Sequence, residues 1–309
     1  MTYRFKEPES IPTGIKRIAT EQVAKAIDKL SNTDDLGVDE AVHQARKRLK
    51  KTRAVIRLVR DRLSKQTYKQ ENARFRDLGR VLSNLRDSSV QIETLDRLTT
   101  HFADTVEPEA FVNIRRELRV DYRREYQRVL DAGAIASVKN QLKDIKIDLE
   151  HWAIKSDGWK ALDSNIKRVY KRGYQALDQA KSEPTAESLH DWRKRVKYLR
   201  HQLEILRPIW SKLIQEWVDQ THDLSDYLGE DHDLAVLQKY ILSQPERFNR
   251  DHTLEILTAL IDRRRTELQS AAVFLGSKIY TEKPKDFVDR LGNYWQIWQE
   301  EIEQSTQFQ

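Results

Sequence analysis

The chain has 309 residues, a formal net charge of +6 and 34% charged residues, but only nine glycines, seven prolines and no cysteine. Without cysteine it has no disulfides, thiolate nucleophiles or cysteine-based zinc sites, and without an 18-residue apolar run it has no membrane-spanning helix. Because glycine and proline are scarce and apolar residues recur at helical spacing, we expect an all-α protein, and a start without an apolar leader predicts a cytoplasmic one.

The apolar periodicity and the helix stop signals, taken in chain order, predict a succession of helices. The breaks between them fall at polar or proline-containing segments such as residues 32–37, 182–184 and 283–284. No segment shows the sustained alternation of a β-strand. The predicted helices span residues 13–31, 38–62, 66–86, 88–103, 108–131 and 136–153 in the first half, and 158–181, 185–207, 211–228, 231–243, 247–272 and 285–303 in the second.

The two halves of the chain repeat one another. Residues 40–53 match residues 187–200 at an offset of 147, which places His43 on His190. A downstream matched block has a Leu-x3-Arg/His-Asp pattern. It pairs Leu82, Arg86, Asp87 and Val90 with Leu228, His232, Asp233 and Val236. Matched blocks in one order at a near-constant offset predict a tandem duplication.

We therefore expect a single domain over residues 1–309 that is made of two antiparallel helical bundles. The first bundle is predicted to span residues 10–153 and the second residues 158–309. The positive charge is uneven between them, since residues 1–150 carry 31 Lys and Arg against 24 Asp and Glu, and residues 151–309 carry 24 against 25. A basic field of this kind attracts phosphate polymers, nucleic acid or anionic membranes.

The repeated helix carries a cationic stripe beside an apolar seam. Like charges at i,i+4 repel, so a row without interleaved acids indicates a bound anion, although one such row alone is often a solvated face. Recurrence of the spacing in both halves favours a binding function. The first stripe is His43, Arg46, Lys50, Arg53, Arg57 and Arg60, and the second is His190, Arg193, Lys197, Arg200 and Arg207, interrupted by Glu204.

Further basic clusters lie outside the repeated helix. Arg115 and Arg119 belong to a cluster near residues 115–124, and Arg264 belongs to the run at residues 263–265. Each cluster by itself is more typical of a solvated surface than of a site, but all three arginines are candidates for anion contacts.

The His-x2-Arg-x3-Lys-x2-Arg helix and the block that follows it resemble the conserved-histidine α-helical domain (CHAD) family over nearly the whole chain. Arg86-Asp87 resembles that family's Arg-Asp turn, and residues 231–233 replace it in the second copy. The resemblance implies non-catalytic binding of inorganic polyphosphate in a basic channel between or along the bundles, with polyphosphate granules or polyphosphate-metabolising enzymes as partners and no cofactor or metal. The implied binding residues are His43, Arg46, Lys50, Arg53, His190, Arg193, Lys197 and Arg200.

Two other functions compete with this interpretation. Nucleic-acid binding also needs a basic groove, but single-strand binders add aromatic platforms, and no aromatic residue lies between His43 and Arg60. Tyr198 is ambiguous, and binding through the phosphate backbone alone stays open as the second choice. A metal-dependent phosphohydrolase is suggested only by His-Asp dipeptides such as His190-Asp191, which are a weak signal, so we expect no catalytic residues and no metal.

Overall fold

A computed structural model describes residues 3–107, 109–248 and 253–307, and these residues form helices and no strand. The α-helices are α1 (Ile11–Ser31), α2 (Thr33–Leu36), α3 (Val38–Leu58), α4 (Lys65–Val81), α5 (Ser83–His101), α6 (Val112–Asp131), α7 (Ala134–Asp148), α8 (Asp163–Ser182), α9 (Ala186–Leu206), α10 (Ser211–Leu242), α11 (Pro245–Phe248), α12 (Thr253–Ile279) and α13 (Pro284–Gln307). Short 3-10 turns lie at η1 (Arg60–Arg62), η2 (Leu149–His151), η3 (Trp159–Ala161) and η4 (Arg207–Trp210).

Side-chain caps fix where several of these helices begin. The Ser10 hydroxyl accepts a hydrogen bond from the Thr13 amide at the start of α1, and the Thr185 hydroxyl accepts one from the Ser188 amide at the start of α9. Each cap satisfies one of the amides that has no partner inside its own helix. The predicted helices at 13–31 and 185–207 are therefore confirmed within two residues.

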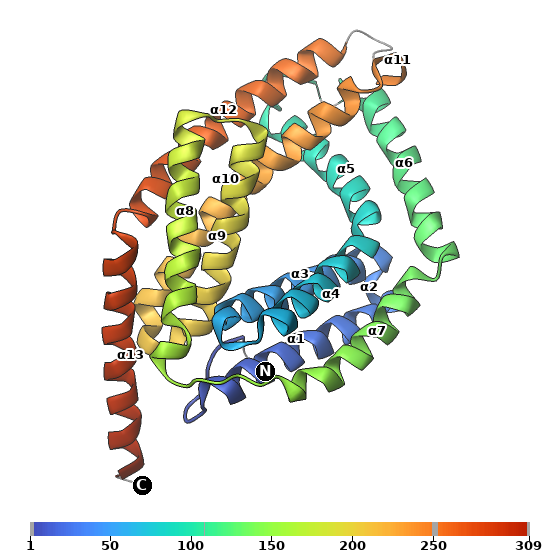
Figure 1. Cartoon of the computed structure of the whole chain (residues 1–309). Coiled ribbons are helices and arrows are strands. Elements are labelled where there is room, and N and C mark those ends of the chain that lie inside the picture. Colours follow the sequence, from blue (N-terminus) through green and yellow to red (C-terminus); the bar gives the residue numbers. More distant parts are fainter. Residues whose placement is uncertain (1–2, 108, 249–252, 308–309) are drawn as a thin grey trace.

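The helices are arranged as a ring (Figure 1). Helix α3 packs on α9, α9 on α10, α10 on α5, and α5 back on α3, so these four helices form a closed circuit. Helices α1 and α7 lie outside α3, α8 lies against α9, and α13 runs along α8. None of the described helices combines the length and the apolar character that a bilayer crossing needs.

Two apolar clusters hold the ring together, and each takes residues from both halves of the chain. The larger follows α1, α3, α8 and α9 and contains the fully buried Trp192 ring. The smaller lies at the far end, where Leu95 and Leu118 of α5 and α6 meet Leu237 and Leu257 of α10 and α12. The matched positions of α3 and α9, both 21 residues long, agree with a duplication, which stays a prediction together with its two bundle boundaries.

Several predicted boundaries are wrong. Helix α4 ends at Val81 and α5 begins at Ser83, so the predicted break at residue 87 does not exist and Arg86-Asp87 lies inside a helix, not in a turn. The two predicted helices at 211–228 and 231–243 form the single 32-residue helix α10. In addition, α3 ends at Leu58, so that Arg60 lies in a 3-10 turn.

Two further boundaries shift in the later helices. Helix α12 runs to Ile279, seven residues beyond its predicted end, and begins at Thr253. The predicted start of this helix at residues 247–252 falls partly on α11 and partly outside the described residues. The predicted start at residue 108 also lies outside them, and α6 begins at Val112. The remaining predicted helices differ from α7, α8 and α13 mainly at their ends.

Candidate functional site

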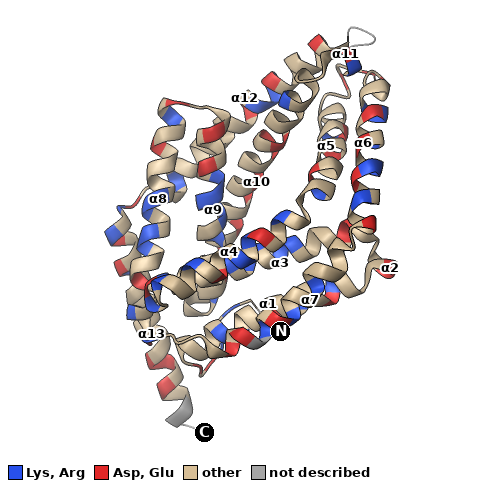
Figure 2. Ribbon diagram, turned by 45° about the vertical axis from the view of Figure 1, so that its right-hand side comes forward, with Lys and Arg blue, Asp and Glu red and all other residues tan. Residues whose placement is uncertain are grey.

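Four cations from α3 and α9 converge at the centre of the ring. Arg46 and Lys50 are one helical turn apart on α3, and Arg193 and Lys197 have the same spacing on α9, so each pair shares one face of its helix. Figure 2 shows Lys and Arg on both helices around the middle of the molecule, where α3 and α9 approach one another. The two predicted stripes therefore meet across the α3–α9 contact.

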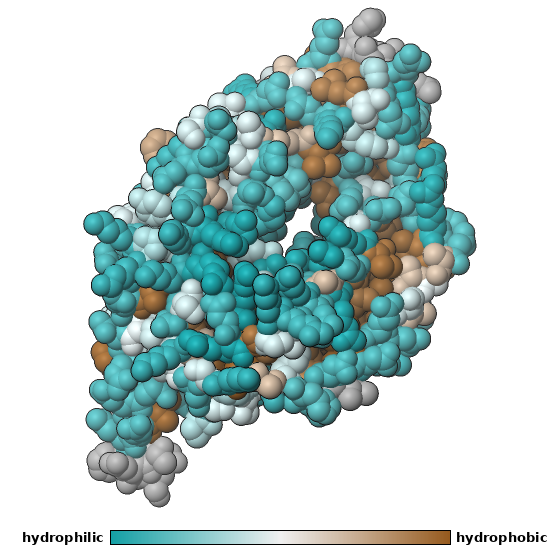
Figure 3. All heavy atoms as spheres, viewed as in Figure 1, coloured by the Kyte–Doolittle hydropathy of each residue, from teal (hydrophilic) through white to brown (hydrophobic). Residues whose placement is uncertain are grey.

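The charges of these four residues act on one another. Desolvation and the positive charges of Arg46 and Arg193 lower the pKa of Lys50 to about 8. Desolvation, followed by the charges of Arg193 and Lys50, lowers the pKa of Lys197 well below its ordinary value. Lys50 is nevertheless exposed to solvent. Figure 3 shows an opening through the molecule with hydrophilic residues at its rim.

The other two helices of the circuit contribute two carboxylates and two more arginines. Asp87 of α5 lies 3.8 Å from Arg46, and Asp233 of α10 lies 3.8 Å from Arg97 of α5. Burial raises the pKa of Asp233, against the lowering effect of Arg193 and other nearby cations. Arg86 of α5 is paired with Glu93, at 2.6 Å. The central cluster thus spans all four helices and has more cations than acids.

Three of the central cations have no carboxylate partner among the described residues. Lys50, Arg193 and Lys197 form no ion pair or hydrogen bond there, and the Nε of Arg193 is buried without an acceptor. A Cβ placed on Gly229 of α10 would lie only 3.3 Å from the Arg193 guanidinium. The side chain is therefore held against the α10 backbone with part of its donor capacity unused, which is costly unless a ligand supplies an acceptor.

Two histidine rings lie close together beside this cluster, tilted by 31° to one another. The His190 ring on α9 and the His232 ring on α10 have centroids 4.2 Å apart. Burial and the positive charges of His190, Arg193 and the neighbouring lysines lower the pKa of His232 to about 3. Burial also lowers the pKa of His190 and of His43, so all three imidazoles are neutral at pH 7.

The first stripe continues outward along aromatic residues. The Arg53 Nε donates to the Asn72 side chain at 3.3 Å, and Arg53, Arg57 and Arg60 form no ion pair with any carboxylate that the structure describes. The Arg57 guanidinium lies over the Tyr198 ring at 4.2 Å, and the Arg60 guanidinium over the Tyr68 ring at 4.8 Å. Aromatic residues from outside the repeated segment of α3 therefore do reach the stripe, but an arginine covers one face of each ring.

Glu204 serves as a link between the two halves. Its carboxylate lies 2.7 Å from the Lys51 ammonium on α3, 3.6 Å from Arg200 and 3.4 Å from the His201 ring. Burial would raise the pKa of Glu204, but His201 and Lys51 hold it at about 2. Because burial lowers the pKa of His201 to about 4, His201 is neutral at pH 7 and acts on Glu204 as a hydrogen-bond donor, which leaves Lys51 and Arg200 as the charge partners.

The remaining candidate arginines lie in other surroundings. Arg115 is held by both oxygens of Asp96, at 2.6 and 2.8 Å, and Arg264 contacts Glu230 at 2.7 Å and Glu267 at 3.2 Å. Arg119 is exposed on α6, which is not part of the central circuit, and Arg207 donates to the Gln215 side chain at 2.7 Å. In the part of the chain that the structure describes, none of these four is joined to the central cations by a hydrogen bond or ion pair.

The sequence alone missed the contributions of α4, α5, α8 and α10. Arg172 of α8 belongs to the outer basic surface, since burial and the charges of Arg195 and Arg60 lower its pKa. The downstream matched block, which contains Arg86, Asp87, His232 and Asp233, was the one sequence signal that pointed to α5 and α10 as part of the site. The described residues contain no group of three or more His, Asp or Glu side chains placed to hold a metal ion.

The fold is a ring of α-helices in which cations of α3 and α9 lie close together. The model of the CHAD domain matches residues 21–242, and the chain belongs to this family. Among solved structures, the CHAD domain from the plant Ricinus communis is similar with a TM-score of 0.65 and 14% identity, covering 88% of this chain and 94% of its own. PptA from Streptomyces chartreusis is similar with a TM-score of 0.61 and 14% identity, covering 89% of this chain and 100% of its own. No curated protein matches the chain.

Proposed function

We propose that this protein binds inorganic polyphosphate, without catalysis, along the cationic wall of its central opening. The observation that carries the proposal is a contrast in pairing. Lys50, Arg193 and Lys197 have no carboxylate partner among the described residues, whereas arginines elsewhere, such as Arg115 and Arg264, are held by Asp or Glu. A polyanion would supply the missing negative charge.

Arginine and lysine suit this ligand for different reasons. A guanidinium offers paired donors in a plane that match two phosphate oxygens, and an ammonium adds a compact positive charge. The unused Nε of Arg193 and the neighbouring Lys197 are such donors. Family membership supports the same ligand class, because the resemblance to CHAD proteins implies polyphosphate, and polyphosphate granules or polyphosphate-metabolising enzymes are the corresponding proposed partners.

The aromatic residues favour a bare phosphate polymer over single-stranded nucleic acid. Stacking of bases needs free ring faces. Arg57 and Arg60 occupy one face of Tyr198 and Tyr68, respectively, and the rings beside the four central cations are the imidazoles of His190 and His232. Phosphate contacts, which need no stacking surface, are what this site provides.

Parallel titrations of long-chain polyphosphate, single-stranded RNA and duplex DNA at two salt concentrations test the proposal. We expect polyphosphate to bind tightest, with an affinity that falls steeply with salt as counterions are released. Tighter binding of either nucleic acid at physiological salt would overturn the ligand assignment. Release of phosphate during incubation with Mg²⁺ or Mn²⁺ would overturn the non-catalytic assignment.

A matched pair of variants locates the binding surface. Replacing both unpaired central lysines (Lys50→Gln, Lys197→Gln) should weaken polyphosphate binding at least tenfold, about 1.4 kcal/mol. Replacing Lys143 and Lys146 by Gln makes the same change in net charge on exposed positions of α7 and should leave the affinity within about twofold. Equal losses in the two variants would mean that overall charge, and not the opening, attracts the polymer.

A further inference from the structure

The opening is enclosed by protein on all sides. Its wall is the circuit of α3, α9, α10 and α5, in which every helix packs on the next and the last packs on the first. Figure 3 shows that the opening passes through the molecule and is not a pit closed at its base. Charged residues from all four helices interact at the opening. Lys50 of α3 interacts electrostatically with Asp87 of α5 and Asp233 of α10, and Arg193 of α9 interacts with Asp233.

Two contacts of the circuit are held by buried side chains. Lys51 and Glu204 join α3 to α9 at 2.7 Å, and the large apolar cluster continues across that contact. At the opposite side, α5 and α10 meet through Leu95, Leu98 and Leu237, which are at most 2% exposed. Separating either contact would transfer these apolar side chains to water, which opposes opening of the ring.

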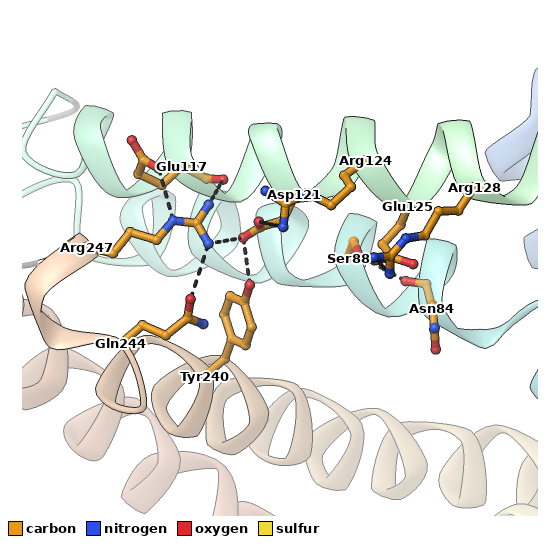
Figure 4. Close-up of polar contacts among 10 residues, drawn as sticks. All are labelled: Asn84, Ser88, Glu117, Asp121, Arg124, Glu125, Arg128, Tyr240, Gln244 and Arg247. Atoms are coloured by element: carbon orange, nitrogen blue, oxygen red, sulfur yellow. Dashed lines mark hydrogen bonds and ion pairs between the residues drawn. The ribbon is translucent and has the colours of Figure 1, made fainter.

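A second connection lies outside the α5–α10 contact. Asp121 of α6 is buried. Its carboxylate accepts a hydrogen bond from the Tyr240 hydroxyl of α10 at 2.6 Å and forms an ion pair with Arg247 of α11 at 2.9 Å (Figure 4). Arg247 also donates to the Glu117 carbonyl at 2.9 Å and contacts its carboxylate at 3.0 Å. Helix α6 is thereby fixed to the second half of the chain, so the ring is closed twice on this side.

We propose that the ring is permanently closed and that a linear phosphate polymer passes through it, entering by a free end. This inference rests on the proposed function and narrows its ligand to linear chains with at least one unobstructed end. A polymer that only lies along an open groove could be reached from the side, and its ends would not matter. In a closed ring, access depends on the ends.

Blocking the ends of the polymer separates these two modes. Long-chain polyphosphate that carries biotin at one end or at both ends can be capped with streptavidin before the protein is added. We expect the singly capped polymer to bind like the uncapped one, and the doubly capped polymer to lose at least tenfold in affinity. The biotinylated polymer without streptavidin is the control for the chemical modification.

The reverse order gives an independent readout. If the protein is bound first and both ends are then capped, the protein should stay on the polymer through a high-salt wash that removes it from uncapped chains. Doubly capped polymer that binds as tightly as uncapped polymer, or a complex that the wash removes despite capping, would overturn threading while leaving the proposed function intact. Failure of the uncapped polymer to bind would overturn the proposed function itself.

Discussion

The ammonium of Lys51 on α3 and the carboxylate of Glu204 on α9 lie 2.7 Å apart in the contact between the two halves, and both side chains are less than one-fifth exposed. Replacing Glu204 by Gln leaves Lys51 in a low-dielectric surrounding without a counter-charge. We expect the free energy of unfolding to fall by about 2–3 kcal/mol, slightly less than for a fully buried pair. Urea denaturation of both proteins measures this change.

The double variant Lys51→Met with Glu204→Gln is the control for that prediction. It removes the unpaired charge and should recover most of the lost stability, whereas equal stability of the single and double variants would show that the pair is not coupled. Because the folded pKa of Glu204 is depressed, the stability from this pair is fully present above the ordinary glutamate pKa and is lost as the pH falls through about 2.

Arg193 and Arg264 should respond in opposite ways to the same substitution. Arg193→Met removes a cation without a carboxylate partner, so stability should stay equal or rise, while polyphosphate affinity falls roughly tenfold to a hundredfold with the loss of a charge-assisted contact. Arg264→Met breaks contacts with Glu230 and Glu267, so we expect a loss of about 1 kcal/mol in stability.

Thermal denaturation and polyphosphate titration of the two methionine variants measure these effects. An unchanged affinity for Arg264→Met would place Arg264 outside the binding site. A loss of affinity as large as that of Arg193→Met would show that the site extends to α12. It would also show that cations paired with carboxylates bind the polymer as well as unpaired ones do.

Polyphosphate affinity should decline at alkaline pH. The pKa of Lys50 is lowered to about 8, and that of Lys197 is lowered as well, while a bound anion favours the protonated form of both. The affinity is therefore retained below pH 8 and falls as the pH rises through that value. Titrations between pH 6 and pH 10 test this, and the alkaline decline should be largely absent from the Lys50→Gln, Lys197→Gln variant.

Binding should be accompanied by proton uptake on the acid side. In the free protein the adjacent His190 and His232 rings have lowered pKa values, about 3 for His232, and a neighbouring phosphate raises both. Protons should therefore be taken up on binding at mildly acidic pH, and affinity should increase as the pH falls. Calorimetry in two buffers with different ionisation enthalpies counts these protons, and His232→Asn should lower the count. No difference between the buffers would place the ligand away from the histidines.

The helices that carry the repeated stripe could be predicted from the sequence because their information is local. The apolar seam beside each stripe defines α3 and α9, and Thr185 caps the start of α9. Gly229 falls in the predicted break at residues 229–230, which the structure does not contain. Here it lies within α10 and leaves room for Arg193, which is a tertiary reason that the local pattern does not contain.

The stripes of α3 and α9 were also predictable, but their surroundings were not. Which cations lack a carboxylate depends on side chains brought from other helices, such as Asp96 to Arg115 and Glu230 to Arg264. The partner of Glu204 could not be predicted from the sequence either. In the sequence it interrupts a cationic row, and in the structure it pairs with Lys51 on the other half.

The smaller apolar cluster has a consequence for how the chain is made. It joins residues of α5 and α6 to residues of α10, α11 and α12, which leave the ribosome much later. Until α10 emerges, Phe111 and Leu118 have no partners from the second half, and the nascent first half presents an apolar surface to the surrounding solvent. The synthesis of this protein therefore includes an interval in which chaperones would find a binding surface that the finished ring conceals.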